Sequence, residues 1–240
     1  MTSIDTRPAI AAAIAAAIAA ICLAAPAFAG PLVIRASGPT AVAFKPGQRL
    51  ADTQALVLRA GDRITVLDAR GTRSFTGPGN FRFDQPGSAA TPTAFAELLT
   101  QKTDRRARIG AVRGVAVQPD GKPVPPGLWA VDTGRSGTVC VLDTARLALW
   151  RADPSVAETL AVSRADRTAN VSFAAEQSIA AWPNTLAGAG EFRVGSSAIT
   201  VQKLVPAPAS LEGLAAALLA KGCTGQVDRL AMLTAVADSR

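Results

Sequence analysis

Short apolar runs separated by turn residues dominate residues 31–85. Residues 63–68 alternate polar and apolar side chains, which is typical of a half-buried strand. Turns that contain Gly, Pro or Asp recur about every ten residues, and this spacing predicts a small antiparallel β domain. The expected strands are residues 32–34, 41–44, 55–58, 63–68, 72–75 and 81–83.

A second series of short apolar runs occupies residues 127–205. Many short strands at such a spacing are typical of a β-sandwich. Trp129, Trp150 and Trp182 lie in these runs, and we expect their rings to pack in the core rather than line a sugar-binding groove. The expected strands are residues 128–131, 138–142, 147–150, 160–162, 170–173, 179–182, 191–194 and 199–201.

Helical spacing of apolar residues appears at the end of the chain. Ser210 is expected to cap a helix that carries one apolar stripe and stops at Gly222. Thr224 is expected to cap a second helix. The stripe residues of the first helix are Leu211, Leu214, Ala215, Leu218 and Leu219, and the inward residues of the second are Val227, Leu230, Ala231 and Thr234. We expect this pair to form a C-terminal lid.

Residues 9–25 form an almost unbroken Ala/Ile run, followed by Pro26 and the triplet 27–29, Ala-Phe-Ala. Small residues at the first and third positions of that triplet fit signal peptidase, so the pattern predicts a cleaved signal peptide over residues 1–29. The alternative is an uncleaved membrane anchor, for which the run is short. The mature chain is therefore expected in the periplasm or secreted, without a transmembrane helix.

The fold predicted for the mature chain is mainly β, with a small β domain, a β-sandwich-like domain and a C-terminal helical pair. Residues 30–86 form the first domain, and residues 127–240 form the second with its helices. Residues 87–126 are a Pro- and Gly-rich connector with one short helix, which begins at Thr91-Pro92 and places Phe95, Leu98 and Leu99 on one face.

The net charge of +7 comes from residues 30–126, because acidic and basic residues are equal in number after them. Within this part a basic cluster is opposed only by Asp104, and such a cluster attracts anionic surfaces. Its members are Lys102, Arg105, Arg106, Arg108 and Arg113. In an envelope compartment the partner would be an envelope protein or an anionic envelope surface, and nucleic acid is not expected. The alternative is a solvated basic loop.

Two cysteines, Cys140 and Cys223, remain after the signal peptide. Exported proteins form disulfides in oxidising compartments, so we expect a bridge that joins the C-terminal helices to a strand. Closing a loop of this length would contribute about 4 kcal/mol in the chain-entropy treatment. Two buried thiols are the alternative.

The sequence contains no histidine. This excludes Ser-His-Asp and Cys-His catalysis and imidazole-bound zinc, and no cofactor or metal is expected. Asp132-Thr133-Gly134 resembles the active-site triplet of aspartic proteases, in which two such aspartates share a proton. Here Arg135 occupies the position where that family has Ser or Ala, and its charge favours the ionised carboxylate.

Residues 47–79 also resemble a known family. Gly47-Gln48-Arg49-Leu50, the run from Leu56 to Leu67 with its Gly61-Asp62 turn, Gly71 and Gly77-Pro78-Gly79 are similar to FecR-type periplasmic domains. The resemblance implies a compact β fold and a role in signal relay or scaffolding across the envelope, without catalysis.

These observations favour an exported, non-enzymatic envelope protein that binds, scaffolds or relays a signal. One alternative is a carbohydrate-binding module that uses the tryptophans. The other is an aspartic-protease-like enzyme around Asp132.

Overall fold

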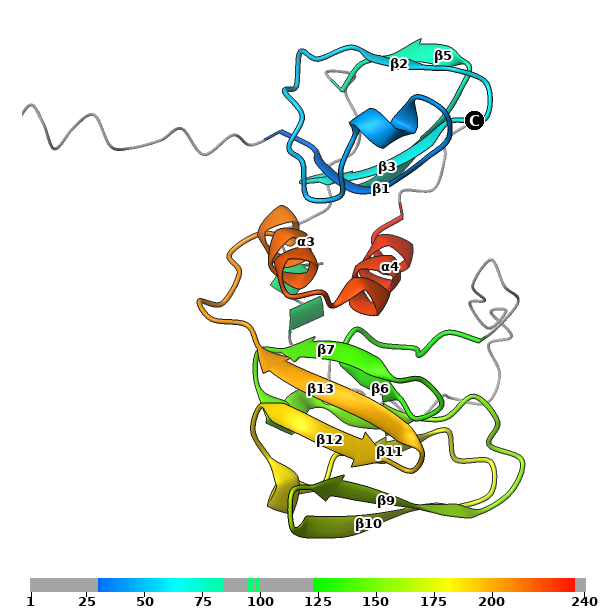
Figure 1. The fold of residues 1–240 in the computed structure, drawn as a ribbon, viewed down its shortest axis with the longest axis vertical. Coiled ribbons are helices and arrows are strands. Elements are labelled where there is room, and N and C mark those ends of the chain that lie inside the picture. The colour runs from blue at the N-terminus through cyan, green and yellow to red at the C-terminus, as the bar shows by residue number, and fades with distance from the viewer. Residues whose placement is uncertain (1–29, 84–94, 97, 100–122, 236–240) are drawn as a thin grey trace, which may run out of the picture.

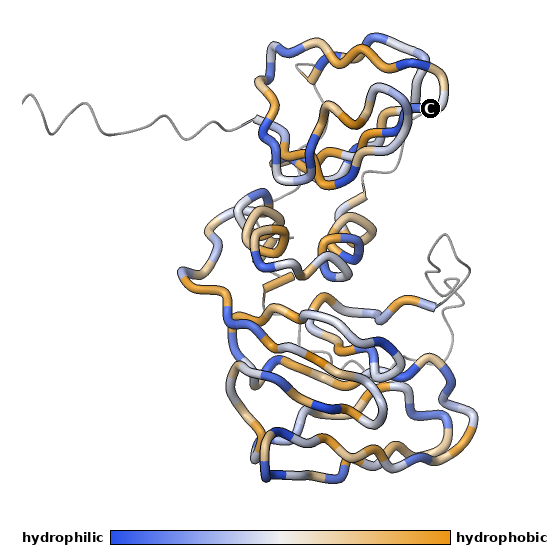
Figure 2. The backbone as a smooth tube through the Cα atoms, viewed as in Figure 1, coloured by the Kyte–Doolittle hydropathy of each residue, from blue (hydrophilic) through white to orange (hydrophobic). Residues whose placement is uncertain are grey.

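The computed structural model describes residues 30–83, 95–96, 98–99 and 123–235, which form three layers (Figure 1). A small β unit and a larger β unit lie at opposite ends, and a pair of helices lies between them. Hydrophobic stretches occur in all three layers and alternate with hydrophilic ones along the strands (Figure 2). The predicted mainly β fold with a C-terminal helical pair is confirmed.

The small β unit contains two sheets. β1 (Leu32–Ser37), β3 (Arg63–Asp68) and β4 (Gly71–Thr76) form an antiparallel sheet in the order β1-β3-β4. β2 (Leu56–Leu58) pairs with β5 (Gly79–Phe81). Between the sheets lies an apolar core to which Val33, Leu56, Ile64, Val66 and Phe83 belong.

One predicted strand of this unit is wrong. Residues 41–44 do not form a strand, because Ala41–Ala43 is a 3₁₀ turn, η1. The backbone N–H groups of Thr40 and Ala41 donate to the Asp62 carboxylate at 2.9 and 3.3 Å, which bends the chain there. A long-range side-chain contact therefore overrides the apolar pattern.

Asp62 connects three segments of the small β unit. Its buried carboxylate accepts hydrogen bonds from η1, from the Thr40 hydroxyl and, at 2.7 Å, from the backbone N–H of Arg59. Its own carbonyl accepts from Gly77 at 2.9 Å. Gly38 has a φ of +113°, and a Cβ there would lie 2.5 Å from the Asp62 Cα. The turn therefore requires both the carboxylate and a neighbour without a side chain.

Acid should destabilise this unit through Asp62. Burial raises the pKa of the Asp62 carboxyl, but the hydrogen bonds from Thr40, Arg59 and Ala41 outweigh it, so the pKa lies below 3.8. Because the folded-state pKa is the lower one, this stabilisation is complete above the unfolded pKa and is lost as the pH falls through the folded value. We expect the urea midpoint of Asp62→Asn to vary less between pH 5 and pH 2.5 than that of the wild type. This pH range brackets the ordinary pKa of an aspartate side chain. Parallel pH profiles of the two proteins would contradict this assignment.

The larger β unit also has two sheets. The five-stranded sheet has the order β10-β9-β12-β13-β7, and the three-stranded sheet has the order β11-β8-β6. The strands are β6 (Ala130–Asp132), β7 (Gly137–Val141), β8 (Ala148–Trp150), β9 (Glu158–Arg164), β10 (Arg167–Phe173), β11 (Ile179–Ala181), β12 (Gly190–Val194) and β13 (Ser197–Lys203). Most pairings are antiparallel, but β13 pairs with β7, and β6 with β8, in parallel. Short 3₁₀ turns at Thr144–Arg146 and Asn184–Leu186 connect the strands.

The three tryptophans are buried in this unit, as expected. The Trp182 ring packs edge-on against Phe192 of β12, with ring centroids 5.0 Å apart. The indole N–H of Trp129 donates to the carbonyl of Leu98 at 3.1 Å. Residues 95–96 and 98–99 are helical, and Phe95, Leu98 and Leu99 pack on the core, which confirms the predicted face. The predicted start of that helix at Thr91-Pro92 lies outside the described residues.

The helical pair consists of α3 (Leu211–Ala220) and α4 (Thr224–Leu233). Ser210 caps α3 as predicted, since its hydroxyl accepts from Gly213 at 3.1 Å. The predicted cap of α4 is wrong by one residue, because Cys223 is the N-cap and Thr224 is already helical. Cys223 is also joined to Cys140 by a disulfide, so the residue that caps α4 is tied to β7.

The helices form a middle layer between the two β units rather than an outer lid. α3 contacts β1 and β3 on one side, while α4 contacts β7 and β4. One apolar cluster runs from Leu32 and Leu67 of the small unit through Leu214 and Leu218 of α3 into the larger unit. Burying apolar surface on both sides of a helix joins the two β units into one core. No helix within the described ranges has the length and apolar character needed to cross a membrane.

Candidate functional site

A hollow of about 220 Å³ lies where the β6–β7 turn meets the start of α4. It contains the Asp132-Thr133-Gly134 region that the sequence singled out, and it brings Asp132 and Arg135 next to Arg229 of α4. The lining residues are Pro125, Asp132, Arg135, Ser136, Gly137, Thr138, Val139, Ile199, Gly222, Thr224, Gly225 and Arg229.

Asp132 shapes the turn that forms one wall of this hollow. Its Oδ1 accepts from the backbone N–H of Gly134 at 3.0 Å, an ordinary Asx turn. Its Oδ2 lies 3.7 Å from the Nε of Arg135. Ser197 fixes the same turn from β13, because its hydroxyl donates to the Thr133 carbonyl at 2.9 Å. The predicted proximity of Arg135 to Asp132 is therefore present.

Arg229 forms the opposite wall, and 8% of the residue is exposed. Its Nη1 donates to the carbonyls of Gly127, at 3.2 Å, and of Ala130, and its Nε donates to Gly225 at 3.3 Å. Burial lowers the pKa of Arg229 to about 10, against the opposing effect of the Asp132 charge. The side chain therefore remains a cation at neutral pH, held in place by backbone carbonyls.

The sequence analysis missed Arg229 and the neighbouring Gln226. Both are buried on α4 beside Val227 and Leu230. Residues three apart on a helix share a face. Gln226 and Arg229 are three apart, and each directly precedes an inward apolar residue, Val227 or Leu230. This spacing is the sequence pattern that could have indicated two buried polar residues.

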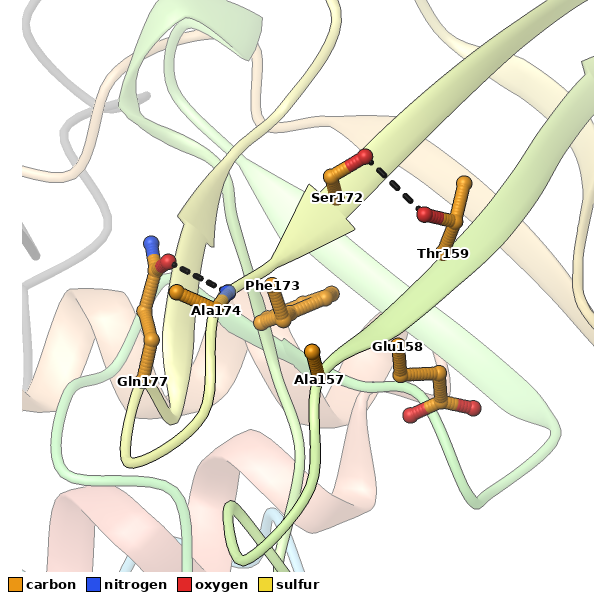
Figure 3. A pocket seen from close by; sticks show the side chains of 7 residues that line it. All are labelled: Ala157, Glu158, Thr159, Ser172, Phe173, Ala174 and Gln177. Atoms are coloured by element: carbon orange, nitrogen blue, oxygen red, sulfur yellow. Dashed lines mark hydrogen bonds between the residues drawn. The ribbon is translucent and has the colours of Figure 1, made fainter.

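A second, wider hollow of about 490 Å³ lies at the ends of β9 and β10 (Figure 3). Phe173 sits among its lining residues, but only 1% of that residue is exposed, so its ring is not available to a ligand. Polar contacts across the lining are internal: Thr159 bonds Ser172 at 3.0 Å, and the side chain of Gln177 accepts from Ala174 at 3.0 Å.

Arg151, next to this second hollow, has a structural role. Its guanidinium lies 5.0 Å from the Phe173 ring centre and 3.5 Å from Glu158. It donates to four backbone carbonyls, those of Pro154, Val156, Ala174 and Gln177. These contacts join two loops. Because the donors of Arg151 and the polar groups of the second hollow are bonded within the protein, the first hollow is the stronger candidate for binding.

The other predicted site residues are placed as follows. Cys140 and Cys223 form the expected disulfide, with an S–S distance of 2.08 Å. The basic cluster Lys102, Arg105, Arg106, Arg108 and Arg113 lies outside the described residues, and its anionic partner stays a prediction. Burial of the tryptophans removes the exposed rings on which the carbohydrate-binding alternative depended. In the part of the chain that the structure describes, no group of three or more Cys, Asp or Glu residues could hold a metal ion.

We find no family model, no curated protein and no solved structure that matches this chain. The resemblance of residues 31–85 to FecR-type domains therefore stays a prediction.

Proposed function

We propose that the chain is an exported, non-enzymatic protein of the cell envelope that binds a partner and serves as a scaffold or signal relay. The observation that carries this proposal is the buried disulfide between Cys140 of β7 and Cys223 at the start of α4. Structural disulfides belong to oxidising compartments, and the signal-peptide pattern of residues 1–29 independently predicts export to one.

The arrangement of layers supports a binding role. The helical pair packs on both β units, so that each unit presents its outer surface while the inner surfaces share a core. The one motif with catalytic precedent, Asp132-Thr133-Gly134, has its carboxylate engaged by Gly134 and Arg135.

Export is tested by expressing the full chain with a C-terminal tag in a Gram-negative bacterium. We expect tagged protein in the periplasmic or culture fraction, with Gly30 as its first residue and no free thiol on alkylation. The matched control lacks residues 2–29 and should remain in the cytosol with both thiols reduced. A full chain that stays in the cytosol with its leader attached and free thiols would contradict the proposal.

A further inference from the structure

We infer that β10 (Arg167–Phe173) is an interaction surface on which a second copy of this chain pairs antiparallel, so that the five-stranded sheets of the two copies become one sheet. β10 is an edge strand of that sheet and lies at the end of the molecule opposite the small β unit (Figure 1). The contact depends on neither export nor signal relay, so it goes beyond the proposed function.

The backbone groups at the outer edge of β10 belong to Thr168, Asn170 and Ser172. On β9, the carbonyl of Ala161 accepts from Gly195, which follows β12, at 2.9 Å, so Ala161 points away from β10. Asn170 lies opposite Ala161. In an antiparallel pair, two residues that lie opposite each other either bond each other or both point outward. The N–H and carbonyl groups of Asn170 therefore point outward, and so do those two positions before and after it.

This edge differs from the other sheet edges of the molecule. Gln48 bonds the edge at β1, Thr234 bonds the edge at β4, and Gln226 bonds the edge at β7. Among residues 30–83, 95–96, 98–99 and 123–235, no group bonds the outward backbone groups of β10. Natural edge strands avoid pairing through proline, bulges or inward charges. β10 has none of these, since its pairing with β9 is regular and the inward residues within it are Ala169 and Val171.

The strand is complementary to itself. A two-fold axis through Asn170 places this residue opposite its own copy and places Thr168 opposite Ser172 of the other copy, so every outward residue finds a partner. Hydroxyl pairs of this kind stabilise neighbouring strands, and one already joins β9 to β10 at 3.0 Å. On the other face, Ala169 lies opposite Val171 of the other copy. Both are partly buried against the core, and pairing would bury the apolar surface that they still expose.

Charge favours the antiparallel orientation. The turn end of the β9–β10 hairpin has more basic than acidic side chains, whereas the open end has more acidic than basic ones. The residues at the turn are Arg164, Asp166 and Arg167, and those at or next to the open end are Arg151, Asp153, Glu158 and Glu176. Antiparallel pairing puts the turn end of each copy beside the open end of the other, so opposite charges meet. Parallel pairing would put like ends together.

The contact is short, so the dimer is weak and reversible. Interfaces of small area belong to transient complexes, and we expect a dissociation constant between about 1 μM and about 1 mM. Because β10 lies at the end opposite the small β unit, the dimer would carry its two small units at its far ends. A scaffold of this kind presents two equal surfaces that face away from each other.

Sedimentation equilibrium tests the dimer. The chain is purified under oxidising conditions from cells that express the full sequence. We expect the molar mass to rise with concentration from that of one chain to that of two, and to stop there, because a two-fold contact is closed. The mass of one chain at every concentration up to about 1 mM, or growth well beyond two chains, would overturn the inference.

Asn170→Pro separates this edge from any other surface. Proline is tolerated where the N–H of an edge strand faces solvent, so the variant should keep its urea midpoint. It cannot donate to the other copy, and dimerisation should weaken about tenfold or more. The control Asn170→Thr keeps the N–H and should dimerise as the wild type does. Unchanged dimerisation in Asn170→Pro, or equal weakening in both variants, would contradict pairing through the backbone.

A charge variant tests the orientation. Arg167→Glu reverses a charge at the turn end and should weaken dimerisation, most strongly at low salt. Arg63→Glu makes the same change at an exposed position of β3 in the small unit and should have no effect. Equal effects of the two variants would show that only the net charge of the chain matters, which would contradict the proposed orientation.

Amide hydrogen exchange of the wild type locates the contact without any variant. We expect exchange at Thr168, Asn170 and Ser172 to slow as the concentration rises, because their N–H groups become bonded. Ser74, an exposed residue two places after Thr72 on the outer edge of β4, is the control and should not change. Dimerisation without slower exchange on β10 would overturn the inference. All these measurements use purified protein, so their outcome is independent of whether the cell exports the chain.

Discussion

Replacing Cys140 and Cys223 together with alanine will lower the free energy of unfolding by about 4 kcal/mol. The bridge closes a loop that spans 83 positions of the chain, which contains the strands β8 to β13 and helix α3. Without the bridge the unfolded chain gains conformational freedom, which favours unfolding. Urea unfolding of the oxidised wild type and of the double variant, followed by tryptophan fluorescence, measures the difference.

Reduction provides the control for this prediction. A reductant should lower the stability of the wild type to near that of the double variant and should leave the double variant unchanged. The prediction would be contradicted if the free energy of unfolding of the double variant lay within about 1 kcal/mol of that of the oxidised wild type. The bridge would then restrict the unfolded chain very little, as occurs when the unfolded state is already compact.

The sequence predicted this disulfide more readily than the layer that it holds in place. Only two cysteines follow the signal peptide, and one of them lies in a clear strand pattern. The position of the helices between two β units depends on the apolar faces of β1 and β3, and no local pattern states which surface a helix will cover. The predicted lid therefore became a middle layer.

Strands with regular alternation were the easiest elements to predict. Residues 63–68 match β3 from end to end. Residues 41–44 failed because the apolar run Ala41–Phe44 was evaluated without Asp62, which lies about twenty positions later and turns the backbone there. Tertiary hydrogen bonds of this kind commonly override local preference.

The candidate site shows the same division between local and distant information. Asp132 and Arg135 were found because they belong to one turn and one recognisable triplet. Arg229 was not, because its carbonyl partners Gly127 and Ala130 lie about a hundred positions away in the chain. A polar residue on the inward face of a helix is informative only when the opposite surface is known.

Gln226 is the other buried polar residue on the inward face of α4. Gln226→Leu should lower the free energy of unfolding by about 3 kcal/mol. β7 is an edge of the five-stranded sheet, and Gln226 pairs with it as a neighbouring strand would. Its Oε1 accepts from the Cys140 N–H at 2.6 Å, and its Nε2 donates to the carbonyls of Cys140 and Leu128 at 2.9 and 3.0 Å. Leucine has nearly the same volume but leaves three buried backbone groups without a partner. Urea unfolding under oxidising conditions measures the loss.

The matched control is Gln177→Leu. Gln177 also bonds the backbone in both directions, accepting from Ala174 at 3.0 Å and donating to Ile179 at 2.7 Å, but it is exposed. Water can replace its bonds, so its substitution should cost less than about 1 kcal/mol. Equal losses at the two positions would show that burial at Gln226 adds nothing. Because Gln226 pairs with the residue that carries the disulfide, the Gln226→Leu loss should also change when the bridge is absent, as expected for groups in direct contact.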